Sequence, residues 1–194
     1  MSNDSVSNLM RGHMESLAKE GKRADGRGIN EFRKVTIETG MLNTAEGSAM
    51  VKLGNTKVLC GIKMLIGTPY GDSPGSGTMM TTTELAPLAD QSFDPGPPRE
   101  QSIELPRVVD RGIRESRMID FEGLCIEHGE KVWTVFIDLH ILDNGGNLFD
   151  CCTLAAAAAL SNAKIPNVQH GVAAKDVDLP VTCWPISCLS LINI

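Results

Sequence analysis

Three arginines near the middle of the chain have a spacing that could bring them to one surface. In an α-helix, Arg107, Arg111 and Arg114 fall within about 60° of one another around the axis. The guanidinium group is well shaped to bind phosphate, so this row predicts a contact surface for a nucleic-acid backbone. The alternative is a solvent-exposed face, on which Asp110 and Glu115 each lie four residues from an arginine and offset the repulsion. The spacing alone is compatible with both interpretations.

The opposite face of this predicted helix is apolar, and we expect it to pack against the core. That face consists of Leu105, Val108, Val109 and Ile113. Pro106 has no backbone N–H and is tolerated in the first turn of a helix but not in its interior. The sequence therefore predicts that the helix begins near Glu104.

A second set of polar residues lies on a predicted strand. Asp138 and His140 are two residues apart and point to the same side of that strand, as an acid–base pair would. The sequence contains no evident nucleophile beside them. We therefore favour a half-buried polar contact over a catalytic pair.

The composition is that of an ordinary globular protein. The 194 residues suit one domain or slightly more, and 42% of them are hydrophobic and 22% charged. The net charge of −6 argues against a protein that coats nucleic acid over its whole surface, but it allows a local basic row.

The cysteines and the lack of targeting signals predict a cytoplasmic protein. The six cysteines form no C-x-x-C motif, so we expect free thiols in a reducing compartment, with no metal site and no cofactor. The N-terminal residues do not resemble a signal peptide. No apolar run approaches the roughly eighteen residues of a membrane span, so we expect no membrane association.

The periodicity of the apolar residues predicts the elements that position these side chains. A helical period predicts an N-terminal helix at 5–20, the arginine helix, and an alanine-rich helix at 148–164. A period of two predicts strands at 35–38, 49–53, 58–66, 78–85, 124–127, 131–142 and 179–194. We expect the strand 58–66 to be central and buried on both faces, because it is almost continuously apolar. The order of the elements predicts an α+β fold with a mixed or antiparallel sheet and two main helices on it.

The alanine-rich helix has a clear start. Asn147 is a good N-cap residue, with Asp150 three residues later. We expect Asn147 to cap the helix, and the small side chains to let the helix pack closely on the sheet.

Five short motifs together resemble the RNase PH family. They are Arg23-x-Asp25-Gly26-Arg27, Gly47-Ser48-Ala49-x-Val51-x-Leu53-Gly54-Asn55-Thr56, Asp94-Pro95-Gly96-Pro97-Pro98, Glu104-Leu105-x-Arg107-Val108-Val109-Asp110-Arg111 and Asp143-x-Gly145-Gly146-Asn147. The resemblance covers about residues 20–187 and is strongest to the non-catalytic RNase PH-like ring subunit of archaeal exosomes. It implies an RNase PH-like fold, of the ribosomal protein S5 domain 2-like type, whose second half is largely missing from this chain.

The resemblance also implies three parts of the chain. These are an N-terminal helix at 1–22, an RNase PH-like first domain at 23–166, and the start of a truncated second half at 167–194. Residues 189–194 depart from the family pattern, so we expect a shortened chain.

Active members of the family use inorganic phosphate to remove nucleotides from the 3′ end of RNA. The turn before their alanine-rich helix reads Gly-Thr-Arg or Gly-Ser-Arg and holds the attacking phosphate, and a catalytic Asp lies in the second half of the fold. This chain has Gly146-Asn147-Leu148 at that turn. The resemblance therefore implies no catalytic residue here and no phosphorolytic activity of the chain alone.

The partners implied by the resemblance are an active RNase PH-like subunit, alternating with this one in a hetero-hexameric ring, and RNA-binding cap subunits of the exosome. In such rings the inactive subunit contributes arginines that hold single-stranded RNA. Arg111 and Arg114 match those positions best, and Arg107 lies in the same segment. Two alternatives are a phosphate-dependent 3′→5′ exoribonuclease active on its own, and a scaffold of the same fold whose arginines are only solvated.

Overall fold

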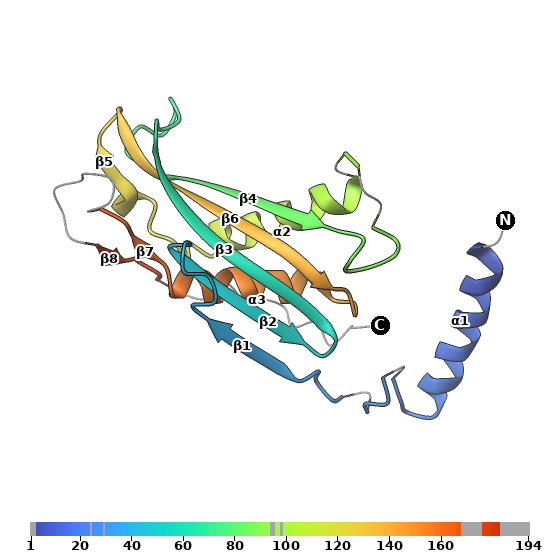
Figure 1. Cartoon of the computed structure of the whole chain (residues 1–194). Helices are drawn as coiled ribbons and strands as arrows, with labels where there is room; N and C mark the ends of the chain where they lie inside the picture. The colour runs from blue at the N-terminus through green and yellow to red at the C-terminus, as the bar shows by residue number, and fades with distance from the viewer. Residues whose placement is uncertain are drawn as a thin grey trace. The chain divides into compact units, whose positions relative to one another are not determined.

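The computed structural model describes residues 3–23, 25–28, 30–93, 96–97, 99–167 and 176–182 (Figure 1). The chain forms two compact units, residues 1–33 and 34–194. In the first unit, α1 (Asn3–Lys19) confirms the predicted N-terminal helix. It is followed by Gly21, whose φ of 72° is one that glycine adopts without strain. Among the described residues, no helix is both long enough and apolar enough to cross a membrane.

The second unit is built on a mixed β-sheet. Its strands are β1 (Val35–Thr39), β2 (Gly47–Leu53), β3 (Thr56–Gly67), β4 (Thr78–Leu85), β5 (Cys125–Glu127) and β6 (Lys131–Asp143). They lie in the order β1-β2-β3-β6-β4, with β5 beside β6. The pair β4–β6 is parallel, and the other described pairings are antiparallel. A short separate pair is formed by β7 (Lys164–Ile165) and β8 (Val177–Asp178). The predicted α+β fold with a mixed sheet is confirmed.

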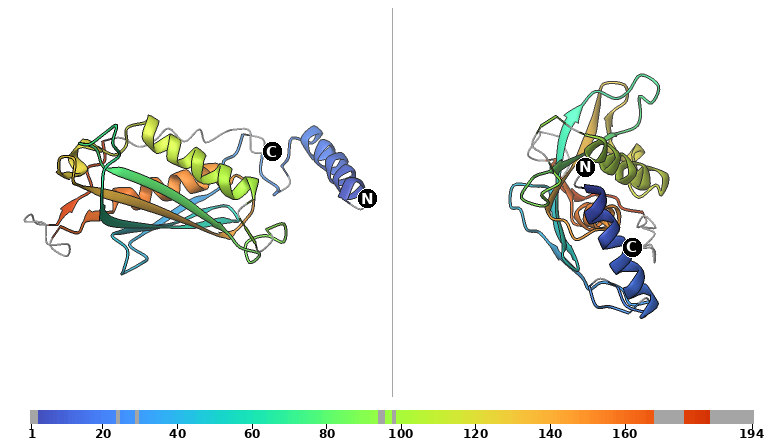
Figure 2. Two further views of the ribbon diagram at one scale, coloured as in Figure 1. Left: turned by 90° about the horizontal axis from the view of Figure 1, so that it is seen from above. Right: turned by 90° about the vertical axis from the view of Figure 1, so that its right-hand side faces the viewer.

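The helices α2 (Glu100–Glu115) and α3 (Leu148–Ser161) pack on the same face of this sheet (Figures 1 and 2). α2 lies against the edge strand β4, whereas α3 lies against β2 and β3. A short 3-10 turn, η1 (Glu122–Leu124), leads into β5. The alanines at 155–159 are all buried and let α3 approach the sheet closely. At Gly47 a Cβ atom would lie only 2.5 Å from the carbonyl oxygen of Ala159.

The central strand β3 corrects one prediction. It lies between β2 and β6, as expected, but only one of its faces is buried. Val58, Ile62 and Met64 are fully buried, while Leu65 on the other face is 49% exposed. Within this unit, α2 and α3 cover a single face of the sheet, so an apolar run in β3 does not imply burial on both sides.

The helix α2 corrects two further predictions. It begins at Glu100 rather than near Glu104, so Pro106 lies in its interior and is buried. The missing N–H of Pro106 leaves the Ser102 carbonyl without its helical donor, while the proline ring itself is buried and adds apolar burial. Val108 is 46% exposed rather than buried, because the helix contacts its neighbours through a stripe about 100° away from it. That stripe is Leu105, Val109 and Ile113.

The predicted last strand, 179–194, falls mostly on residues 183–194, which lie outside the described residues. In the described part, Val181 forms an isolated bridge with Ile119. The backbone N–H of Thr182 donates to the Met118 carbonyl at 2.8 Å. This segment therefore runs beside the end of α2.

Candidate functional site

The exposed face of α2 carries the predicted arginines, and the structure divides them into two kinds. Arg107 and Arg111 lie one turn apart, about 6 Å along the helix axis, and both are exposed. Within the described residues, Arg107 makes no ion pair or hydrogen bond. Arg111 has a side chain that is 82% exposed and lies 3.9 Å from Glu115. An ion pair that is so long and so exposed to solvent contributes little to stability. The guanidinium groups of Arg107 and Arg111 therefore both remain available to a ligand.

Arg114 is instead held by the protein itself. Its Nε donates to Asp110 Oδ2 at 2.7 Å, and its Nη2 donates to the Met79 carbonyl oxygen at 2.7 Å. Its guanidinium carbon lies 5.7 Å from the centre of the Phe121 ring, within cation–π range. These contacts fasten α2 to β4, which is the edge strand of the sheet. That Arg114 contacts RNA stays a prediction, and its present contacts give it a structural role.

A groove of about 680 Å³ lies beside the two available arginines. Ile103 and Val108 contribute to its lining and are 49% and 46% exposed. Guanidinium groups next to exposed apolar side chains suit a nucleic-acid strand, which presents both phosphates and flat bases. Sequence reasoning missed this apolar component. Helical spacing could have identified Ile103 from the sequence, because this residue precedes Arg107 by one helical turn on the same face.

Charge is distributed unevenly along this face of α2. Glu100 and Glu104 lie on the first half of the helix and also line the groove, whereas Arg107 and Arg111 lie on the second half. The helix dipole favours this order in the free protein. An anionic ligand would be attracted to the second half of the helix and repelled by the two carboxylates.

The turn before α3 is built differently from a phosphate site. Asn147 is the N-cap residue of α3, as predicted, but its side chain makes no capping hydrogen bond. Its φ of 57° and ψ of 51° are left-handed, whereas a capping side chain needs an extended backbone to reach the helix N–H groups. Its Nδ2 donates to Asp150 Oδ2 at 2.8 Å instead. Leu148 packs against the core, so the turn offers an aliphatic side chain and a carboxylate rather than a guanidinium.

The β2–β3 hairpin holds this turn in place. The backbone N–H of Gly145 donates to Thr56 Oγ1 at 3.0 Å, and that hydroxyl donates to the Gly146 carbonyl at 2.7 Å. A Cβ atom on Gly145 would lie 2.9 Å from the Cβ atom of Asn55, so only glycine fits. The sequence motifs at residues 47–56 and 143–147 therefore contact each other in the folded chain.

Asp138 and His140 form polar contacts on the face of the sheet away from the helices. Thr82 donates to Asp138 Oδ1 at 2.5 Å, and His140 Nδ1 lies 3.1 Å from Glu84 Oε2. Each side chain is paired with β4 rather than with the other. The predicted polar contacts are confirmed, and the absence of a catalytic role for this pair stays a prediction.

Asp90, Cys60 and Cys152 have shifted pKa values with clear causes. Hydrogen bonds from the backbone and hydroxyl of Ser92, and from Asn144, hold the pKa of Asp90 below its usual range. Burial raises the pKa of the Cys60 and Cys152 thiols. Among the described residues, no cluster of His, Cys, Asp and Glu side chains could hold a metal ion.

Comparison with known proteins decides the family. Residues 31–166 match the model of the 3′ exoribonuclease family, domain 1, which is the RNase PH domain. The chain belongs to the RNase PH family. It is 52% identical to the Exosome complex component Rrp42 of Methanocella arvoryzae over 194 residues, which is 100% of this chain and 74% of that protein. It is 50% identical to the protein of the same name from Archaeoglobus fulgidus over 192 residues, covering 99% of this chain and 74% of the relative.

Solved structures of the RNase PH family are similar as well. One is an Archaeoglobus fulgidus exosome with RNA bound to the active site, with a TM-score of 0.87 and 51% identity over 91% of this chain and 69% of that chain. Another is an archaeal exosome core, with a TM-score of 0.83 and 47% identity over 94% of this chain and 69% of that chain. The predicted family and the RNase PH-like fold are confirmed.

Proposed function

We propose that this chain is a non-catalytic ring subunit of an exosome that binds single-stranded RNA and positions an active RNase PH-like subunit for 3′→5′ RNA degradation. Its relatives are named as exosome components, and one similar structure is an exosome with RNA at its active site. Arg107 and Arg111 would hold the RNA backbone. The active subunit and the RNA-binding cap subunits would be its protein partners.

The contrast between α2 and the start of α3 carries this proposal. α2 presents Arg107 and Arg111 to solvent beside a groove. The α3 turn presents Leu148, packed on the core, and the carboxylate of Asp150, which is 8% exposed. Phosphate binding needs donors and positive charge, and these two side chains provide neither. The chain is therefore suited to hold RNA but not to bind the attacking phosphate, which disfavours an exoribonuclease active on its own.

Phosphorolysis by the full chain tests the catalytic part of the proposal. Labelled single-stranded RNA and inorganic phosphate are incubated with the chain alone and then with an active RNase PH-like subunit. We expect nucleoside diphosphate release only from the mixture. Release by the chain alone, eluting with its own peak in size-exclusion chromatography, would contradict the proposal.

Salt-dependent RNA binding by the assembled ring tests the role of the arginines. Replacing Arg107 and Arg111 by alanine should lower the affinity and reduce the slope of log K against log salt by about 1.4, since each phosphate contact to a single strand contributes about 0.7. Lys52→Ala is the matched control, because it removes one positive charge from a strand outside the groove, where Lys52 pairs with Glu38 at 2.8 Å. An unchanged affinity and slope in the double variant would favour a scaffold with solvated arginines.

A further inference from the structure

The strand β1 forms an open edge of the sheet. It stands at the end of the strand order, and among the described strands it pairs with β2 alone (Figure 1). Its five residues pair with β2 without a bulge, and none of them is a proline. Bulges and prolines are two of the features by which proteins keep an edge strand from pairing with another chain. The strand β1 has neither of them.

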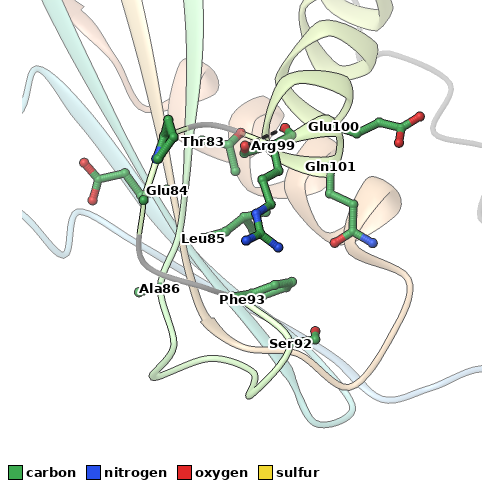
Figure 3. A pocket seen from close by; sticks show the side chains of 12 residues that line it. Thr83, Glu84, Leu85, Ala86, Ser92, Phe93, Arg99, Glu100 and Gln101 are labelled. Atoms are coloured by element: carbon green, nitrogen blue, oxygen red, sulfur yellow. Dashed lines mark hydrogen bonds between the residues drawn. The ribbon is translucent and has the colours of Figure 1, made fainter. Parts of the chain in front are cut away.

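The opposite edge strand, β4, is covered by the protein itself. The helix α2 packs against it, and the Arg114 guanidinium donates to the Met79 carbonyl near the start of the strand. Near the end of the strand, Thr83 and Leu85 line the same cavity as Glu100 in the first turn of α2 (Figure 3). The fold therefore covers β4 along its length and leaves the edge at β1 open.

The backbone of β1 alternates between β2 and the open edge. The N–H of Gly54 donates to the Lys34 carbonyl at 3.0 Å, and the N–H of Gly40 donates to the Ser48 carbonyl at 2.9 Å. The even-numbered residues of this segment therefore bond to β2, and the backbone groups of the odd-numbered residues point away from it. Those odd-numbered residues are Val35, Ile37 and Thr39. No other described strand lies along that side.

The order of the side chains makes this edge complementary to a second copy of itself. Two-fold antiparallel pairing through the open edge must place odd-numbered residues opposite odd-numbered ones, so the axis can pass at Val35, Thr36 or Ile37. With the axis at Thr36, Lys34 lies opposite Glu38 of the second copy, and the symmetry forms this pair twice. In the other two registers, Lys34 would lie opposite an uncharged residue. Charge therefore selects the register centred on Thr36.

The remaining side chains suit the same register. Val35 would lie opposite Ile37 of the second copy, on the face of the sheet that carries the helices, and each is 41% exposed in the free chain. Thr36 would lie opposite its own copy. Opposite charges, β-branched pairs and threonine pairs are the cross-strand contacts that stabilise antiparallel sheets. Lys34 and Glu38 would form non-hydrogen-bonded pairs, in which the side chains lie closest.

Both charged side chains can be reached in the free chain. Lys34 is exposed. Glu38 accepts a hydrogen bond from Lys52 Nζ at 2.8 Å, but its side chain is still 42% exposed. A second cation can therefore approach Glu38 from the side of the open edge.

We propose that the chain alone forms a two-fold dimer in which β1 pairs antiparallel with β1 of a second copy, with Thr36 at the axis. The two sheets would then form one continuous sheet. Because β1 has only five residues, we expect a small interface and a dimer that depends on protein concentration rather than a permanent one. The dimer does not depend on a role in the exosome, and its absence would leave that proposed role as it stands.

Sedimentation velocity of the full chain, without any other subunit, tests the pairing of charges. Lys34→Glu places two carboxylates opposite each other, and Glu38→Lys places two ammonium groups opposite each other. Each variant should dimerise about tenfold more weakly than the wild type, because two attractive pairs become repulsive. An equimolar mixture of the two variants restores opposite charges in both pairs and should recover most of the wild-type affinity. Lys131→Glu, a charge reversal at the start of β6, is the matched control and should dimerise like the wild type.

Amide hydrogen exchange measured by NMR tests where the copies meet. We expect the N–H groups of Val35 and Ile37 to exchange more slowly as the protein concentration rises, because they become bonded to the second copy. The N–H groups of Thr36 and Glu38 face β2 and should be protected at every concentration.

Four results would overturn the proposal. The first three are a monomer up to millimolar concentration, a dimer in which Val35 and Ile37 exchange as fast as in dilute solution, and no recovery in the mixture of the two charge variants. The fourth is protection of Val35 and Ile37 only after an active RNase PH-like subunit is added, because the open edge would then belong to that partner.

Discussion

Replacing Arg114 by alanine should reduce the stability of the fold, whereas the same replacement of Arg107 or Arg111 should not. The i,i+4 ion pair with Asp110 is worth about 0.3–0.5 kcal/mol, and the contact with Phe121 about 0.5–1 kcal/mol at an exposed site. The hydrogen bond to the Met79 carbonyl has a charged donor, but the Arg114 side chain is 42% exposed, so we reduce its contribution to about 1 kcal/mol. The sum is about 2 kcal/mol.

Thermal and urea unfolding, followed by circular dichroism, measure this effect. For a chain of this size, about 2 kcal/mol lowers the melting temperature by roughly 4–8 °C. Arg111→Ala is the matched control on the same helix face, and its stability should stay within about 0.5 kcal/mol of the wild type. Arg114→Lys should recover only part of the loss, because an ammonium group lacks the planar fork that reaches Asp110 and Met79 together.

Two results would contradict a structural role for Arg114. If Arg114→Ala unfolds at the same temperature as the wild type, its contacts do not stabilise the packing of α2 on β4. If the same variant also lowers RNA affinity as much as Arg107→Ala does, Arg114 belongs with the RNA-binding arginines. The division of the row into two kinds would then be wrong.

The close contact at the end of α3 and the loop at Asp90 allow two further tests. Gly47→Ala should destabilise the fold by about 1–3 kcal/mol in thermal unfolding, because its Cβ would lie 2.5 Å from a backbone carbonyl oxygen of α3. Gly71→Ala, where nothing lies within 4 Å of the added atom, should have little effect. The lowered pKa of Asp90 contributes stability that is present above its unfolded pKa, about 3.9, and lost as the pH falls through the folded pKa. An NMR titration should show this pKa, and Asn144→Ala should raise it while leaving the Ser92 hydrogen bonds in place.

The strands could be predicted from sequence because their signal is local. In β6, Val135, Ile137 and Leu139 are buried, and they alternate with Thr134, Phe136 and Asp138, which are only partly buried. The burial of β3 could not be predicted in the same way. Leu65 is as apolar as its buried neighbours, yet α2 and α3 pack on the other face of the sheet, and that depends on where distant elements pack.

At the candidate site, the local sequence likewise predicts only part of the structure of α2. The local rule for proline predicts a helix start near Glu104, but α2 begins four residues earlier, at Glu100, with Pro106 buried in its interior. The arginine row was predictable from a helical period. The difference between Arg114 and the two available arginines could not be predicted in this way, because the carbonyl that accepts from Arg114 belongs to Met79, 35 residues away in the chain.

The turn before α3 has two side chains that do not suit phosphate, two residues apart in the chain. The β2–β3 hairpin fixes the backbone of the turn through Thr56. Leu148 replaces the expected guanidinium with an aliphatic group that packs on the core. Asp150, hydrogen-bonded by Asn147, places a carboxylate at the helix N-terminus, where it occupies the favourable end of the dipole. A phosphate at this turn would therefore meet no donor from these two side chains and a negative charge, which is why our proposal assigns the attacking phosphate to another subunit.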